Sequence, residues 1–199
     1  MGGDTRSDAE LIEQFLDGHA VAFDSLVRRY QEPLYGFLRR LAGNDDLAND
    51  LFQDSFIKVM RALPEYKEAG KFRSWLFGVA RNLAMDRLRR RTLERGIFRY
   101  SGADDEDMNR LEYGTIAPEE HPDAIVEREE RAKLLHDAME DLPESQREVL
   151  SLRYEADLTF RQIAEITGVS INTVVGRARY GIAALKKKLG TRLEEEFVQ

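Results

Sequence analysis

The sequence contains no cysteine, only one tryptophan and no long run of apolar residues. The absence of cysteine excludes disulfide scaffolds, thiol catalysis and cysteine-based zinc sites, and it fits a reducing cytosolic environment. No segment approaches the ~20 apolar residues that a membrane-spanning helix needs. Charged residues follow Met1 within a few positions, so the sequence predicts no signal peptide. We therefore expect a cytoplasmic protein that makes no direct contact with a membrane.

Residues that carry catalysis are scarce as well. The three histidines, His19, His121 and His136, are scattered, and no nucleophile or paired carboxylate accompanies them. The sequence has no glycine-rich loop of the kind that cradles phosphates. Its acidic run at residues 104–107 lacks the glycine and carboxylate spacing of a calcium loop. The sequence therefore predicts no enzyme activity, no metal site and no cofactor.

Charge is abundant and unevenly distributed. Charged residues make up 34% of the chain, and the formal net charge is -7 at pH 7. The excess acid lies within residues 96–130, whereas basic residues cluster within residues 87–95 and 177–188. Basic clusters of this kind are typical of local surfaces that face phosphate groups. The net charge therefore does not exclude a nucleic-acid partner.

The pattern of apolar residues predicts an all-α protein. Apolar residues recur at three- and four-residue steps in two segments, so we expect two small helical domains at residues 1–95 and 123–199. Residues 96–122 contain glycine, proline and acid without an apolar period, which predicts a flexible acidic linker. Pro33 is expected to kink or divide the second helix, because it supplies no N–H and clashes with the preceding turn.

The helix expected after residue 71 combines two unlike faces. Its apolar stripe contains Phe72, Leu76, Val79, Ala80 and Leu83. A second face carries Trp75, Asn82 and Arg89, which lie seven residues apart. An aromatic, an amide and a cation together suit an unpaired nucleic-acid strand, whose bases stack on aromatic rings and whose phosphates bind cations. The alternative is a core tryptophan on an amphipathic helix with a solvated basic end.

The preceding helix, expected within residues 45–63, has a polar face. Asp50, Gln53, Asp54 and Lys58 remain outward when the apolar residues are buried, and Met60 is expected among the buried ones. An acidic and amide face can dock a basic partner helix. The alternative is that this row is only a solvated surface.

Residues 158–177 have the layout of a helix-turn-helix. Thr159 caps a short helix, Gly168 supplies the turn, and Ser170 caps a second helix. The outward side of that second helix mixes short, amide and arginine side chains that can approach base edges and phosphates. Gly176 inside the helix costs roughly 1 kcal/mol against alanine, which suggests close approach of a backbone or ligand. The alternative is a helical packing module that makes no DNA contact.

These segments together resemble bacterial extracytoplasmic-function (ECF) RNA polymerase sigma factors, a group within the sigma-70 family. The resemblance rests on four motifs in the family's order, at residues 46–56, 72–82, 142–147 and 159–180. It implies a sigma factor that binds core RNA polymerase, recognises minus-10 and minus-35 promoter DNA and initiates transcription of a specific regulon. It also implies control by an anti-sigma factor, through which alone a membrane contact would arise.

The resemblance assigns a role to each of three sets of residues. The first set binds polymerase, although Phe56 fits the core equally well: Asp50, Gln53, Asp54, Phe56 and Lys58. The second set binds the minus-10 element: Tyr66, Lys71, Phe72, Arg73, Ser74, Trp75, Arg81, Asn82, Arg87, Arg89 and Arg90. The third set binds the minus-35 element: Thr159, Arg161, Ser170, Asn172, Thr173, Gly176, Arg177, Arg179 and Tyr180.

One stretch departs from the family's common pattern. Many members place arginine at the positions held here by Tyr180 and Ile182, whereas this chain offers Arg179. The departure affects which phosphates are contacted. A different class of protein also remains open, a stand-alone helix-turn-helix transcriptional regulator that binds duplex DNA. That alternative explains residues 159–188 but leaves the Trp75 and Asp50 faces without a role.

Overall fold

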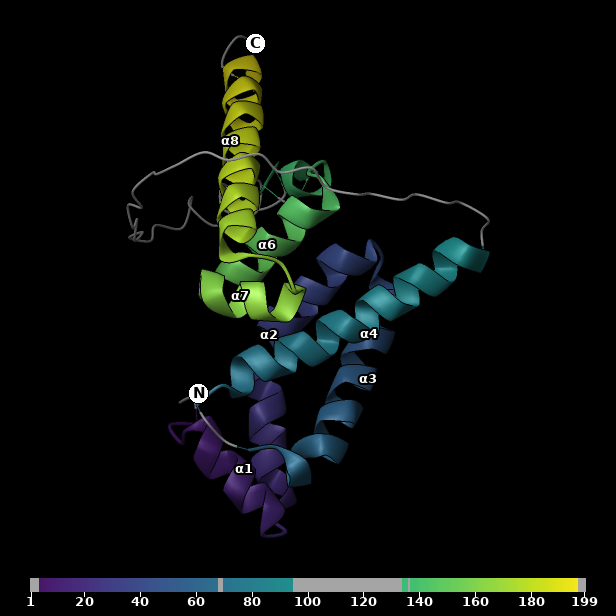
Figure 1. Cartoon of the computed structure of the whole chain (residues 1–199), viewed down its shortest axis with the longest axis vertical. Helices are drawn as coiled ribbons and strands as arrows, with labels where there is room; N and C mark the ends of the chain where they lie inside the picture. The colour runs from purple at the N-terminus through teal and green to yellow at the C-terminus, as the bar shows by residue number, and fades with distance from the viewer. Residues whose placement is uncertain (1–3, 68–69, 95–133, 136, 197–199) are drawn as a thin grey trace.

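The computed structural model describes residues 4–67, 70–94, 134–135 and 137–196, and these ranges are helical without strands (Figure 1). The all-α prediction is confirmed for this part of the chain. The predicted linker at residues 96–122 lies outside the described residues. No helix of the described part is long and apolar enough to cross a membrane.

The first domain consists of four α-helices and one short 3-10 helix. They are α1 (Asp8–Leu16), α2 (Ala20–Ala42), α3 (Asp45–Ala62), η1 (Leu63–Glu65) and α4 (Phe72–Glu94). Ser7 and Glu10 form the capping box that starts α1. Gly43, at φ +70°, ends α2, and the Asn44 side chain accepts a hydrogen bond from the Leu47 N–H at 2.8 Å to start α3.

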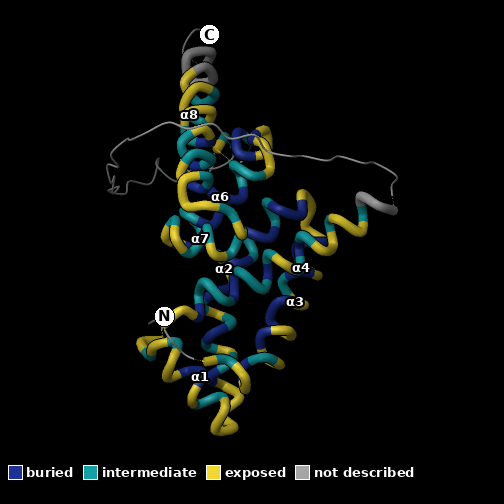
Figure 2. Tube along the Cα trace, viewed as in Figure 1, coloured by how far each residue is buried: buried dark blue, intermediate teal, exposed yellow. Residues whose placement is uncertain are grey.

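The core of this domain forms where α2, α3 and α4 pack together (Figure 2). Tyr30, Leu34 and Phe37 are fully buried on α2. They flank Pro33, and α2 continues through this proline without the division that the sequence allowed. Burial on both sides of Pro33 holds one helix, because the apolar contacts offset the single lost backbone hydrogen bond.

The second domain contains the predicted helix-turn-helix. Its helices are α6 (Glu144–Tyr154), α7 (Phe160–Thr167) and α8 (Ile171–Glu196), preceded by helical residues at 137–140. Thr159 and Gln162 form a capping box on α7, and Gly168 makes the turn at φ +73°. The Ser170 hydroxyl accepts a hydrogen bond from the Thr173 N–H at 3.0 Å, which caps α8.

A glycine does allow close packing in α8, but at a different position from the predicted one. A Cβ at Gly181 would lie 2.8 Å from Leu150 Cδ1, so α6 and α8 cross closely there, and a side chain at this position would force Leu150 to shift. Gly176 has nothing within 4 Å of its Cβ position. The predicted close approach of a backbone to Gly176 is therefore wrong, because the helices cross one turn further along.

The two domains pack against each other in this structure. Figure 1 shows α6 and α7 resting on α2 and α4, with α1 at the opposite end of the molecule. The C-terminal part of α8 extends beyond the other helices of the molecule (Figure 1). This arrangement brings side chains of the second domain onto the surface around Trp75.

Candidate nucleic-acid interface

Three aromatic side chains meet where η1 is followed by α4. The Tyr66 and Trp75 rings are stacked, with centroids 4.4 Å apart and planes 27° apart. Phe72 meets Tyr66 and Trp75 at centroid distances of 6.0 and 5.8 Å. The Ser74 hydroxyl donates to the Lys71 carbonyl at 2.9 Å, at the start of the helix that carries Trp75.

Trp75 and Phe72 differ in access to solvent. Trp75 is half-buried, whereas Phe72 is 1% exposed and also packs against Tyr30 at 5.6 Å. The expected direct contact of Phe72 with DNA is therefore a misassignment, because its ring is enclosed by the core. The Phe72 ring instead packs against the Tyr66 and Trp75 rings from within the core.

A cavity of about 430 Å³ opens beside this stack. The first domain lines it with apolar, amide and basic groups: Tyr66, Lys67, Lys71, Ser74, Trp75, Gly78, Val79 and Asn82. The second domain contributes Gln162, Glu165 and Ile166 of α7. The structure thus brings five predicted minus-10 residues to one cavity, since aromatic rings, lysines and an amide face it together.

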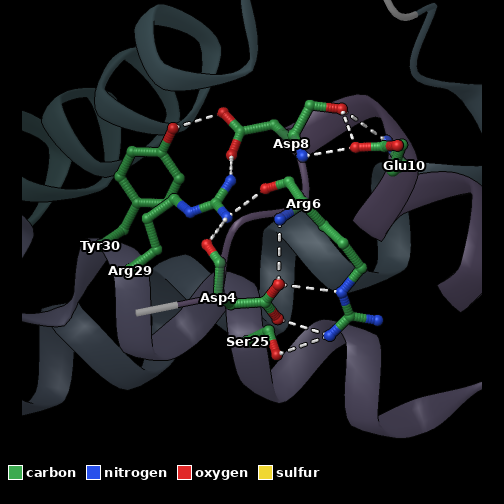
Figure 3. A network of polar contacts seen from close by, with 8 residues as sticks. Asp4, Arg6, Asp8, Glu10, Ser25, Arg29 and Tyr30 are labelled. Carbon is green, nitrogen blue, oxygen red and sulfur yellow. Dashed lines mark hydrogen bonds and ion pairs between the residues drawn. The ribbon is translucent and has the colours of Figure 1, made fainter. Parts of the chain in front are cut away.

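Polar contacts link the start of α1 to Arg29 and Tyr30 of α2 (Figure 3). Asp8 accepts hydrogen bonds from the Tyr30 hydroxyl and from Arg29, and Arg29 also donates to the Arg6 carbonyl. Burial and the Asp8 carboxylate raise the pKa of Tyr30, so the phenol stays protonated. The Arg73 guanidinium lies over the Tyr30 ring at 5.5 Å.

Ion pairing also fixes the segment that precedes α1. Asp4 pairs with Arg6, and the hydrogen bond from that guanidinium lowers the pKa of the Asp4 carboxyl. Hydrogen bonds from Ser7 lower the pKa of Glu10, because they favour its charged form. The segment is thereby held against α2, where Arg6 also reaches Ser25 (Figure 3).

The arginines of α4 fall into two groups. Arg73 and Arg81 reach the second domain: Arg81 Nε donates to Glu148 Oε1 at 2.6 Å, and Arg73 donates to the Ala156 carbonyl at 3.1 Å. Arg87, Arg89 and Arg90 are exposed beyond the domain contact. Arg87 lies 3.8 Å from Asp50, and Arg89 lies 3.9 Å from Asp86, distances that make weak surface pairs.

The predicted polymerase-facing row on α3 is exposed, with one exception. Asp50, Gln53, Asp54 and Lys58 face solvent, whereas Phe56 is only 6% exposed and its ring meets Phe52 at 5.0 Å. Burial in the core excludes Phe56 from direct contact with a partner in this structure.

Two apolar side chains that are not among the predicted polymerase-binding residues also lie on this face. Ile57 and Met60 are 43% and 39% exposed, so the predicted burial of Met60 is wrong. Ile57, together with Asp54 and Lys58, lines a shallow cavity of about 470 Å³ that reaches Leu83 of α4. The three-residue step from Asp54 to Ile57 was the available signal, because residues three apart share a helix face.

The predicted minus-35 residues are spread over α7 and α8, from Thr159, which caps the start of α7, to Tyr180 of α8. Thr159, Arg161, Ser170, Asn172 and Tyr180 are exposed. Thr173, Gly176, Arg177 and Arg179 are half-buried along α8. Val174 and Ala178 lie on the opposite, buried side of the helix. The first turns of α8 therefore carry amide, hydroxyl and guanidinium groups away from the buried side of the helix.

Comparison with known proteins connects both domains to one family. Residues 26–94 match the family model Sigma-70 region 2, and residues 138–187 match Sigma-70, region 4. The chain is 31% identical to RNA polymerase sigma factor CarQ of Myxococcus xanthus, over 90% of this chain and 95% of that protein. It is 30% identical to the ECF RNA polymerase sigma-E factor of Haemophilus influenzae, over 86% of this chain and 89% of that protein.

Solved structures share the fold. The sigma factor RpoE of Bartonella quintana, solved in complex with the anti-sigma factor NepR, has a TM-score of 0.63 and 23% identity. The match covers 84% of this chain and 96% of that one. CnrH, solved with the cytosolic domain of CnrY, has a TM-score of 0.62 and 23% identity, covering 94% and 99% of the two chains.

Proposed function

Because this chain belongs to the ECF group of sigma-70 family RNA polymerase sigma factors, we propose specific surfaces through which it directs core polymerase to promoters. The single observation that supports the proposal most is the joint presence of an exposed acidic face on α3 and an aromatic, basic cavity on α4. A protein that uses both would bind polymerase and a melted strand at the same time. We propose that it acts in the cytoplasm, where polymerase works.

The α3 face binds core polymerase in this proposal. Asp50, Asp54 and Lys58 provide exposed charge for a partner of complementary charge. Ile57 and Met60 add apolar contact area between those charges. An interface of this composition has an apolar centre with a polar rim.

The α4 surface binds the minus-10 strand. Trp75, stacked on Tyr66, offers an aromatic platform for an unstacked base, and base stacking is worth ~1–3 kcal/mol per base. Lys67 and Lys71 at the cavity edge are placed for phosphates. The cost of flipping a base, about a few kcal/mol, would be returned by this stacking and by the amide of Asn82.

The α8 surface binds the minus-35 duplex. Asn172 is exposed at the first turn of α8, and the predicted contacts Thr173 and Arg177 follow it along the helix. A stand-alone helix-turn-helix regulator is not retained, because the Sigma-70 region 2 match accounts for residues 26–94. We also propose control by an anti-sigma factor, since the two structurally similar proteins were solved with partners, one of them named an anti-sigma factor.

Capture of core RNA polymerase tests the function. We expect the wild-type chain to capture core polymerase and the Asp50→Lys, Asp54→Lys variant to lose most of that capture, because the acidic face is reversed in charge. Asp24→Lys, Glu32→Lys is the matched control, since it makes the same charge change at two exposed residues of α2. Failure of the folded wild type to capture polymerase would refute the proposal.

A further inference from the structure

Two aliphatic side chains are exposed in the first turns of α8. Ile171 and Val175 are 46% and 39% exposed, although both belong to residue types that are usually buried. They lie four residues apart on the helix and therefore share one face, whereas Val174 and Ala178 form its buried side. The packing of the second domain does not account for either exposed residue.

Polar groups surround these two side chains on the same helix. Asn172 is also exposed and lies three residues before Val175, so its amide and the valine methyl groups face the same side. Arg179 continues the row of Ile171 and Val175 by four further residues. A Cβ at Gly176 would meet no atom of the described part of the chain within 4 Å, its own helix aside. A partner can therefore approach the backbone next to Val175 closely.

The major groove of duplex DNA matches this combination of groups. Thymine is the one base that presents an apolar group there, its C5-methyl group, and the adenine paired with it presents N6 and N7 to an asparagine amide. Phosphates along the groove bind arginine. Valine and isoleucine each hold mostly one side-chain conformation in a helix, so their methyl groups have a fixed direction before binding. A protein partner fits less well, because a stable protein interface takes about 20–30 residues from each side.

We propose that Val175 and Ile171 contact thymine C5-methyl groups in the minus-35 element and determine its sequence together with Asn172. The inference rests on the proposed function of the α8 surface. The two aliphatic residues are separated by ~6 Å along the helix axis, which corresponds to about two base steps of DNA. The minus-35 element should therefore contain two thymines, on either strand, close to the adenine that Asn172 contacts.

Replacement of thymine by uracil tests these contacts one methyl group at a time, because uracil pairs as thymine does and lacks only that group. Holoenzyme assembled from the full chain and core polymerase first selects duplexes from a random-sequence pool, which identifies the minus-35 element. Fluorescence anisotropy then measures the affinity of the holoenzyme for the selected duplex with each minus-35 thymine replaced in turn. The wild type should lose about fourfold in affinity at each of two positions, the value of one buried methyl group.

Alanine variants assign each methyl contact to a side chain. Val175→Ala should no longer respond to uracil at one of the two positions, and Ile171→Ala should no longer respond at the other. Val21→Ala is the matched control, because Val21 is 72% exposed on α2 in the first domain, and it should respond as the wild type does. Circular dichroism confirms that each variant is folded. A wild-type response to uracil in both α8 variants would overturn the proposal.

Core polymerase capture on the same preparations separates this inference from the proposed function. Capture by the wild type, together with a selected element whose thymines are insensitive to uracil, would overturn only the methyl contacts. A selected minus-35 element without thymine on either strand would overturn them as well. Failure of the folded wild type to capture polymerase would overturn the proposed function and with it the premise of this inference.

Discussion

At the scale of single residues, the neighbouring aromatic side chains of Phe72 and Trp75 differ in burial. Phe72 is fully buried against Tyr30, whereas Trp75 is half-buried beside a cavity. The sequence pattern placed Phe72 on the apolar stripe of the helix and Trp75 on its second face, but a helix repeat assigns faces and not depth, so it did not indicate how far each ring is buried. Depth depends on what covers the face, here α2 and η1.

This division predicts different outcomes for two alanine variants. Phe72→Ala should lower the free energy of unfolding by about 3–5 kcal/mol, since it empties a core site. Trp75→Ala should abolish promoter opening by the polymerase holoenzyme while polymerase capture stays close to that of the wild type. Urea denaturation and permanganate footprinting of a cognate promoter measure the two effects. Normal promoter opening by Trp75→Ala would show that the melting surface lies elsewhere.

The buried carboxyl of Glu155 leads us to expect an unusual pH dependence of the free energy of unfolding. Burial raises the pKa of its carboxyl above the ordinary 4.5, and the attraction of Arg40 only partly opposes this. The folded state therefore holds the proton more tightly than the unfolded state, so this group adds stability as the pH falls. The free energy of unfolding of the wild type, relative to Glu155→Gln, should rise as the pH falls from neutral toward the ordinary carboxyl pKa of 4.5. Urea denaturation at several pH values would measure it, and a fall on acidification would contradict the assignment.

At the scale of helices, the boundaries were predictable and the contacts between helices were not. The caps Ser7, Thr159 and Ser170 act on neighbouring backbone N–H groups, so a few adjacent residues determine them. Glu155 and Arg40 are 115 residues apart, and no local period indicates that they meet. The predicted close approach of a backbone to Gly176 failed for the same reason, since helix crossing depends on the partner helix. The alternative, close approach of a ligand to Gly176, stays a prediction.

The crossing of α6 and α8 can be tested with two glycines of one helix. Gly181→Ala should destabilise the protein by about 1–3 kcal/mol, because the added Cβ would lie 2.8 Å from Leu150 Cδ1. Gly176→Ala is the matched control and should stabilise the helix by up to ~1 kcal/mol, since its Cβ position is open. Thermal unfolding by circular dichroism compares the two. Equal melting temperatures would mean that α6 and α8 do not cross at Gly181.

At the scale of the whole molecule, one domain contact changes the use of two surfaces. The docked second domain lies over the α4 cavity but leaves Asp50, Asp54 and Ile57 on α3 exposed. A partner could therefore bind α3 without any movement of the domains, whereas a DNA strand could reach the α4 cavity only after α7 is displaced.

The pair formed by Arg81 and Glu148 separates domain opening from DNA contact. Glu148→Gln removes the charge facing Arg81 but keeps the guanidinium, so the domains should open and single-stranded DNA should bind more tightly than to the wild type. Arg81→Ala leaves Glu148 buried without its cation, which also favours opening, because an uncompensated buried charge costs about 3–5 kcal/mol. This variant lacks one proposed phosphate contact, however. The slope of log affinity against log salt should therefore be smaller for Arg81→Ala than for Glu148→Gln by about 0.7. Equal slopes in two open variants would show that Arg81 serves the domain contact alone.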